Sequence, residues 1–349
     1  MADQSPSRLS VAATVTFHIT TAIAVTIVNK SVLNTLPVPI TLLLAQAVIS
    51  IAILGLAYMM KLYVPAKLDS TYIRGVAPLL AMKIIAQLSK TYCLLNVNAS
   101  FYQIARGLLL PLTILLSFVL LKDSRPSFWA SAACAITTFG FVIGVSGEAV
   151  GQATNIGIAW GVWSSLTTAF ETVLVKYLAL KTRVLDLVFV TSLACVPAYT
   201  VMAYLNGEMS HLSALGAMHP VMVTFDKKVL LSGLFNFALS AAAYLQIRVT
   251  SPTTHMISTA ARGVLQSALA VVFLGAERLT ASRIKSIAVI LTGTMLYTFI
   301  KDMEKRGKTI KGQALPLHRT NPQHQQQSSR PMFGEEGVPL METKGTEEK

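Results

Sequence analysis

Ten apolar stretches of about 20 residues, separated by polar connections, run through most of this chain. A helix of that length crosses the hydrocarbon core of a bilayer, because each residue adds about 1.5 Å along the axis. The composition agrees, since 53% of the residues are hydrophobic and only 13% are charged. We therefore expect an all-α integral membrane protein. Its ten transmembrane helices are predicted at residues 9–28, 38–60, 73–95, 100–121, 128–145, 156–178, 185–205, 229–247, 253–273 and 284–300.

The two ends of the chain differ from its middle. Residues 1–8 form a polar leader, and residues 9–302 hold the ten predicted helices. From Lys301 onward the apolar character is lost, and a basic run is followed by glutamine, proline, glycine and glutamate. Such a composition cannot bury enough apolar surface to fold. We expect a cytosolic leader, one membrane domain and a disordered cytosolic tail over residues 303–349.

The distribution of Lys and Arg predicts the orientation in the membrane. With the N-terminus in the cytosol, fourteen of these residues near the helix ends lie on the cytosolic side and five on the other. Both termini are therefore expected in the cytosol. The net charge of +13 is dispersed over connections between helices, and no soluble domain carries it. A lipid bilayer is the expected environment, and nucleic acid is not an expected partner.

Two tripeptides indicate an internal repeat. Ala105-Arg106-Gly107 and Ala261-Arg262-Gly263 lie 156 residues apart, each on the next-to-last helix of a set of five. Thr20-Thr21-Ala22 of the first helix is matched by Thr167-Thr168-Ala169 of the sixth. Chance similarity between apolar helices is the alternative explanation. The predicted five-helix halves cover about residues 9–145 and 156–300.

An odd number of helices in each half makes the two halves antiparallel in the membrane. Inverted repeats of this kind are typical of alternating-access transporters, whose substrate site lies near the midplane between the halves. Small residues would allow the halves to pack closely. Those expected at the contact are Gly140, Gly144, Ala260, Gly263 and Gly293.

Arg106 and Arg262 lie inside apolar stretches, where a guanidinium costs roughly 3 kcal/mol or more and does not lose its proton. No carboxylate lies within one helical turn of either residue in the sequence. Each arginine therefore needs an anion from another helix, backbone carbonyls or a ligand. Phosphate oxygens suit the guanidinium fork, so we expect a phosphate-bearing ligand.

Other polar residues in the predicted helices complete the candidate site. Lys83 and Lys90 share one helical face, and Glu171 is expected to pair with a lysine or to act as a protonatable coupling site. Lys30 and Lys176 lie near helix ends, where snorkelling to the interface is an equal alternative. The candidate substrate-binding residues are Lys30, Lys83, Lys90, Tyr102, Gln103, Arg106, Glu171, Lys176, Ser258, Thr259, Arg262 and Gln266.

Metal, cofactor and enzyme chemistry are not expected. His18 and His255 lack a second His, Cys or carboxylate at metal-ligand spacing. The sequence contains no glycine-rich phosphate loop, nucleophile elbow or catalytic carboxylate pair. No catalytic residue is assigned.

Two segments resemble a known family. The run from Phe101 to Leu108, continuing to Lys122, resembles the fourth helix of the drug/metabolite transporter superfamily, in its triose-phosphate and nucleotide-sugar transporter branch. The run from Thr250 to Val271 is similar to the eighth-to-ninth helix segment of GDP-fucose transporters. The likeness extends over about residues 15–305.

The resemblance implies a five-plus-five inverted fold in the membrane of the Golgi or, alternatively, the endoplasmic reticulum. It also implies exchange of a cytosolic nucleotide sugar, such as GDP-fucose, for lumenal nucleoside monophosphate. Relatives that carry GDP-sugars have a Lys where this chain has Arg262. Their seventh helix has two asparagines and an aromatic pair, where this chain reads Phe189-Val190-Thr191-Ser192.

Three alternatives stay open. In the first, the cargo is a UDP-sugar. In the second, it is a triose phosphate or another sugar phosphate. In the third, the chain is a non-transporting membrane scaffold that recruits proteins through its C-terminal tail. The sequence leaves a homodimer open as well.

Overall fold

A computed structural model describes residues 8–65, 69–120, 126–148, 155–178, 183–215, 220–249, 252–274 and 280–305. Every regular element in these ranges is a helix. The chain divides into one unit from Met1 to Asp302 and a second from Met303 to Lys349. The predicted leader and nearly all of the predicted tail lie outside the described residues.

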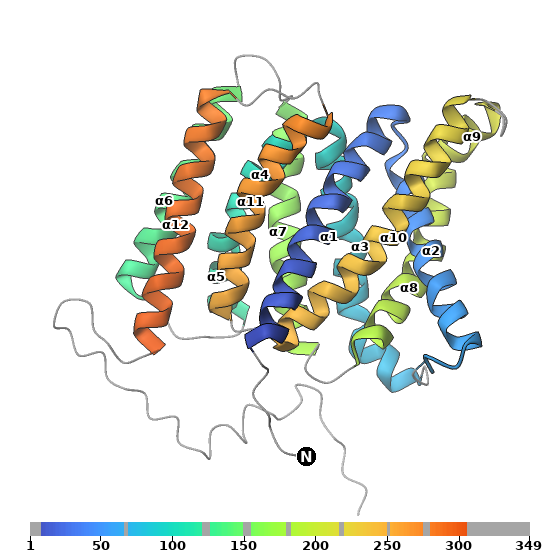
Figure 1. The fold of residues 1–349 in the computed structure, drawn as a ribbon, viewed down its shortest axis with the longest axis horizontal. Helices are drawn as coiled ribbons and strands as arrows, with labels where there is room; N and C mark the ends of the chain where they lie inside the picture. The colour runs from blue at the N-terminus through green and yellow to red at the C-terminus, as the bar shows by residue number, and fades with distance from the viewer. Residues whose placement is uncertain are drawn as a thin grey trace, which may run out of the picture. The chain divides into compact units, whose positions relative to one another are not determined.

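The helices of the first unit run mostly along a common direction (Figure 1). Their bounds are α1 (Arg8–Thr35), α2 (Pro39–Met59), α3 (Ser70–Asn96), α4 (Ala99–Ala105), η1 (Arg106–Leu108), α5 (Leu109–Leu120), α6 (Phe128–Glu148), α7 (Asn155–Leu178), α8 (Val184–Leu205), α9 (Glu208–Leu215), α10 (Pro220–Val249), α11 (Pro252–Leu274) and α12 (Ala281–Lys305).

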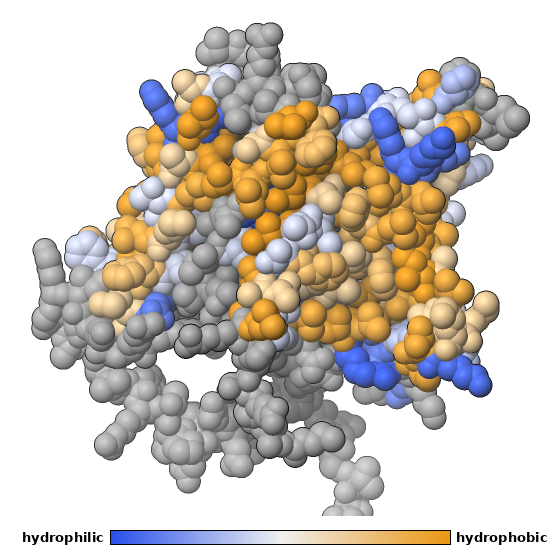
Figure 2. All heavy atoms as spheres, viewed as in Figure 1, coloured by the Kyte–Doolittle hydropathy of each residue, from blue (hydrophilic) through white to orange (hydrophobic). Residues whose placement is uncertain are grey.

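Seven helical segments of the described chain are long and apolar enough to cross a membrane, namely α1, α2, α6, α8, α10, α12 and the segment from α4 to α5. Figure 2 shows an apolar band with hydrophilic side chains gathered at both ends. Helices α3, α7 and α11 have 27, 24 and 23 residues, also enough to cross, but they are more polar. They carry Lys83, Lys90, Glu171 and Arg262, so the ten-helix division stays a prediction.

The predicted fourth span is broken in the middle. Helix α4 ends at Ala105, a 3-10 turn covers Arg106–Leu108, and α5 begins at Leu109. Within this turn the Leu109 N–H donates to the Arg106 carbonyl, which leaves the Ala105 carbonyl to accept a 2.7 Å hydrogen bond from the Ser165 hydroxyl. Pro111 lacks the N–H that the Gly107 carbonyl would accept in a continuous helix. The break places Arg106 at the end of α4.

Helix contacts follow the pairing that the predicted repeat requires. Helix α3 packs on α7, α1 packs on α10, and α2 packs on α8. The predicted repeat pairs α1 with α7, α2 with α8 and α3 with α10. When the two members of each pair are interchanged, the α3–α7 contact becomes the α10–α1 contact, and the α2–α8 contact stays the same. The repeat remains a prediction that these contacts support.

Small residues allow close contact between α6 and α12, as the sequence predicted. A Cβ added at Gly140 would lie 2.9 Å from the backbone nitrogen of Ile290, and one added at Gly293 would lie 2.8 Å from that of Thr137. The Ser286 hydroxyl donates to the Gly140 carbonyl at 2.6 Å. These glycines cannot gain a side chain without moving a backbone.

The short helix α9 was not predicted. It begins at the buried Glu208, whose carboxylate accepts hydrogen bonds from the backbone N–H groups of Ile40 and Thr41 at 3.2 and 2.8 Å. These groups lie in the first turn of α2, whose N-cap residue Val38 supplies no side-chain cap. Glu208 therefore caps α2 from a distant part of the chain.

Candidate functional site

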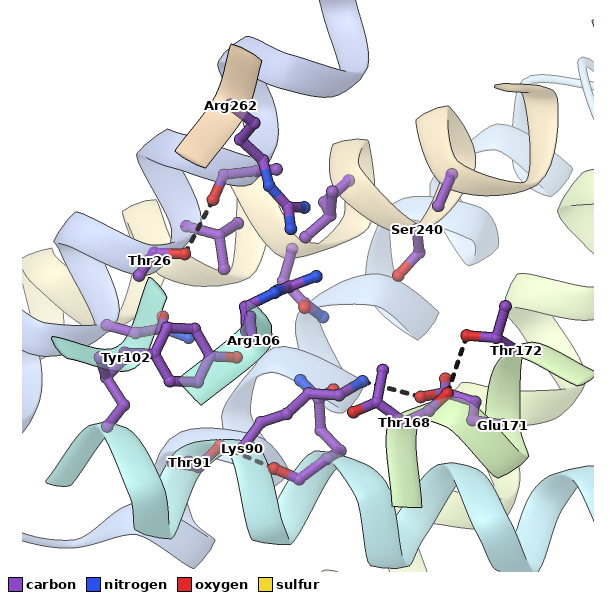
Figure 3. A pocket seen from close by; sticks show the side chains of 18 of the residues that line it. Thr26, Lys90, Thr91, Tyr102, Arg106, Thr168, Glu171, Thr172, Ser240 and Arg262 are labelled. Atoms are coloured by element: carbon purple, nitrogen blue, oxygen red, sulfur yellow. Dashed lines mark hydrogen bonds and ion pairs between the residues drawn. The ribbon is translucent and has the colours of Figure 1, made fainter. Parts of the chain in front are cut away.

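A cavity of about 230 Å³ lies between α1, α3, α7, α10, α11 and the broken helix of α4, η1 and α5. This is far more than the roughly 10–15 Å³ that holds one water molecule. Figure 3 shows side chains from these elements converging on one space. Six of the predicted site residues line it, namely Lys83, Lys90, Tyr102, Arg106, Glu171 and Arg262.

Glu171 of α7 joins the two lysines of α3. Its Oε1 lies 3.1 Å from the Nζ of Lys83, and its Oε2 lies 2.7 Å from the Nζ of Lys90. The lysines are seven residues apart and therefore share one face of α3, against which α7 packs. This geometry supports the prediction that Glu171 pairs with a lysine, and it shows that Glu171 pairs with both lysines at the same time.

Arg106 enters the cavity from η1. Its guanidinium carbon lies 5.8 Å from the centre of the Tyr102 ring, within the range of a cation–π contact. Its Nε is buried and has no hydrogen-bond partner among the described residues. The ring therefore orients the side chain, while the cavity side of the guanidinium keeps donor capacity.

Arg262 enters from α11, and Figure 3 shows it turned toward the space that Arg106 occupies. Only 5% of the residue is exposed. Its Nε and Nη2 atoms are buried and have no hydrogen-bond partner in the described part of the chain. Within that same part, neither Arg106 nor Arg262 forms an ion pair.

The cavity therefore has a strong excess of positive charge. Four cationic side chains line it against one carboxylate, so three positive charges remain in excess among the described lining residues. Unpaired buried charges and donors are costly unless an anion completes them. The arrangement can bind a ligand with at least two negative charges, and the forks of the two arginines match phosphate oxygens.

Four other predicted residues do not line this cavity. Lys30 donates to the carbonyls of Leu94 and Leu95 at the end of α3, at 2.9 and 3.4 Å. The other three are uncharged and lie between helices. Gln103 packs on Gly263, Gln266 donates to the Ala99 carbonyl at 3.4 Å, and Ser258 accepts from Gln246 at 2.8 Å.

The remaining predicted residues are Lys176 and Thr259. They belong to α7 and α11, but their side chains lie outside the described residues. In the described ranges, no group of three or more His, Cys, Asp and Glu side chains could hold a metal ion.

Sequence reasoning missed several neutral polar residues of the cavity. All are polar residues of the helices that line the cavity, and their position among apolar neighbours was the one sequence signal of a role in the site. They are His18, Thr26, Asn29, Gln87, Thr91, Thr168, Thr172, Asn236, Ser240 and Tyr244.

The sequence pattern of the Triose-phosphate Transporter family matches residues 9–298. The chain belongs to this family. It is 39% identical over 308 residues to an uncharacterized transporter of Schizosaccharomyces pombe, covering 86% of this chain and 77% of the relative. It is 30% identical over 317 residues to GDP-fucose transporter 1 of Mus musculus, covering 85% and 84% of the two chains. The resemblance seen in the fourth and ninth helices is thereby confirmed.

A solved crystal structure shares the fold. The TM-score is 0.56, with 86% of this chain and 100% of the other covered, at 16% identity. Because members of the family are transporters, the cavity lies in a multi-pass membrane transporter.

Proposed function

We propose that the protein is a nucleotide-sugar antiporter of the Golgi membrane. It exchanges a cytosolic nucleotide sugar, GDP-fucose or a similar GDP-sugar, for lumenal nucleoside monophosphate. The likeness to GDP-fucose transporter 1 of Mus musculus supports the class of cargo. The resemblance of the ninth helix to GDP-fucose transporters supports the compartment.

The unpaired guanidinium nitrogens of Arg106 and Arg262 carry this proposal. Both residues line one cavity, and buried donors of both lack partners among the described residues. Lys83 and Lys90 already share Glu171. The arginines are therefore the groups that bind phosphate, and a diphosphate offers enough oxygens for both forks.

The same charges explain coupling between the two fluxes. A nucleoside monophosphate and a nucleotide sugar both bring phosphate to the arginines. An empty cavity keeps three uncompensated positive charges, which oppose the rearrangement that moves the site through the membrane. Reorientation is therefore expected with a phosphate-bearing ligand bound, as the two halves move around a central site.

Exchange in proteoliposomes tests the proposal. Vesicles loaded with GMP should take up labelled GDP-fucose, and empty vesicles should take up much less. External GMP should compete, whereas UMP and triose phosphate should compete weakly. Equal uptake by empty and loaded vesicles would contradict antiport, and competition by UMP alone would assign a UDP-sugar.

One observation favours a second cargo, a smaller sugar phosphate. The α8 stretch Phe189–Ser192 lacks the two asparagines of the GDP-sugar carriers that the chain resembles. Thr191 and Ser192 instead line a smaller cavity of about 40 Å³ that shares Lys83, Asn236 and Ser240 with the main cavity. Competition by triose phosphate with none by any nucleotide would assign this cargo.

A further inference from the structure

The cavity has a second wall whose chemistry differs from that of the arginines. Glu171 is the one carboxylate among the described residues that line the cavity. Thr172, Asn236 and Ser240 also line it, and they carry hydroxyl or amide groups. Figure 3 shows Glu171 and Thr172 on one side of the space, with Arg106 and Arg262 on another.

Glu171 retains hydrogen-bond capacity after both lysines are counted. An ionised carboxylate can accept about four hydrogen bonds, two at each oxygen. Lys83 occupies one position at Oε1, and Lys90 occupies one at Oε2. Each ammonium has three donors, of which Glu171 uses one. The cluster therefore presents acceptors and donors side by side.

Phosphate can use only part of this wall. At neutral pH its oxygens mainly accept hydrogen bonds, so they can bind the two ammonium groups but not the acceptor positions of Glu171, whose charge also cancels one of the two positive charges. A group that binds here must donate to the carboxylate oxygens and accept from the lysines. Sugar hydroxyls do both, and the hydroxyl and amide groups of Ser240 and Asn236 offer them further partners.

We propose that Glu171, bridging Lys83 and Lys90, forms with Asn236 and Ser240 a binding site for the glycosyl hydroxyls of the cargo. This assignment rests on the proposed function, because it presumes a cargo with both phosphate and sugar. It divides the cavity into an arginine side that binds phosphate and a Glu171 side that selects the sugar. A nucleoside monophosphate uses the first side and makes no glycosyl contact with the second.

Ligand-binding titrations of purified protein test this division. The probes are GDP-fucose, fucose 1-phosphate and GMP, measured with wild type and Glu171→Gln. Loss of a hydrogen bond to a charged group should weaken binding of the two fucose compounds at least about tenfold. Binding of GMP, which has no fucosyl group, should not weaken, because the variant removes a negative charge from a cavity that binds phosphate.

Two further variants make the result robust. Ser240→Ala removes one neutral hydroxyl and leaves the ion pairs intact, so it keeps the test valid if Glu171→Gln does not fold. It should weaken both fucose compounds about threefold to tenfold and spare GMP. Glu208→Gln is the matched control, because it neutralises a buried carboxylate outside the cavity. In Glu208→Gln, the ratio of the affinity for GDP-fucose to the affinity for GMP should be the same as in wild type.

Several outcomes overturn the inference. Equal weakening of all three probes by Glu171→Gln would make Glu171 a general structural residue. Selective weakening of GDP-fucose and GMP would assign it to the base, and tighter binding of every phosphate compound would make it a competitor for the lysines. Failure of wild type to bind any nucleotide would instead contradict the proposed function.

Discussion

Charged side chains are partnered differently in two regions of this protein. Where α1 and α3 end and α2 begins, Lys30, Lys228 and Glu208 each contact a helix terminus. In the cavity, Arg106 and Arg262 keep buried nitrogens without partners among the described residues. Charges at the helix ends thus have partners within the protein and serve a structural role. The two arginines have buried nitrogens without such partners among the described residues, so a ligand is their expected partner.

The helix-end contacts follow the direction of the helix dipole. Lys30 donates to carbonyls in the last turn of α3, and Lys228 lies 2.8 Å from the Thr35 hydroxyl at the end of α1. Glu208 accepts from the first N–H groups of α2. Cations thus lie at C-termini and the anion at an N-terminus, as the partial charges of helix ends favour.

The largest expected effect is that of Arg262→Ala on transport. Nucleotide exchange should fall at least about 30-fold, because losing a buried charged contact costs roughly 2–5 kcal/mol. The unfolding temperature should stay unchanged or rise, since an uncompensated guanidinium is removed. Arg74→Ala, at an exposed position of α3, is the control and should retain exchange. Normal exchange by Arg262→Ala would show that this arginine does not need a ligand as its partner.

Glu208→Ala should have the largest effect on stability. It leaves two backbone N–H groups and the Thr41 hydroxyl of α2 without their acceptor, which costs roughly 1–3 kcal/mol. Thermal unfolding in detergent measures the loss, with the exposed Asp226→Asn as control. Unchanged stability would show that this capping contact does not matter.

Lys30→Met separates a structural lysine from a substrate contact. The residue is only 7% exposed and donates to two α3 carbonyls, so its loss should lower stability by about 1–2 kcal/mol. The Km for the nucleotide sugar should stay within about twofold of wild type, since the site keeps all its lining residues. A rise in Km without a loss of stability would return Lys30 to the binding site, where the sequence had placed it.

The smallest effect is expected for Lys228→Met. This lysine is half-buried and binds the last turn of α1, so its contribution is about 0.3–1 kcal/mol. The adjacent Lys227 is exposed, and Lys227→Met should not change the unfolding temperature. Equal effects of the two substitutions would show that the contact between Lys228 and Thr35 does not stabilise the end of α1.

Hydropathy predicted the positions of the helices but not their full lengths. Helix α10 begins at Pro220 and α12 ends at Lys305, whereas the predicted spans covered residues 229–247 and 284–300. In α10, Asp226, Lys227 and Lys228 separate the apolar first turns from the predicted span. In α12, the polar residues after Ile300 continue the helix, and a hydropathy window does not register them. The break at Arg106 was missed for the same reason, because averaging over about 20 residues conceals a three-residue turn.

Charge was the main sequence signal for the candidate site. Arg106, Arg262, Lys83, Lys90 and Glu171 line one cavity, because charges inside apolar helices need partners, whereas the charged Lys30 contacts the end of α3 instead. Apart from Tyr102, the neutral lining residues gave no comparable signal. A hydroxyl such as that of Thr172 can bond to its own helix, and here it donates to the Thr168 carbonyl at 2.8 Å.

Thermal stabilisation by ligand tests the phosphate role of Arg262 most directly. Purified wild type and Arg262→Ala would each be unfolded with and without saturating GMP. We predict a rise in the unfolding temperature of wild type that is lost in the variant, because a ligand that binds only the folded state stabilises it. An equal rise in both proteins would contradict the account, since phosphate would then bind without Arg262.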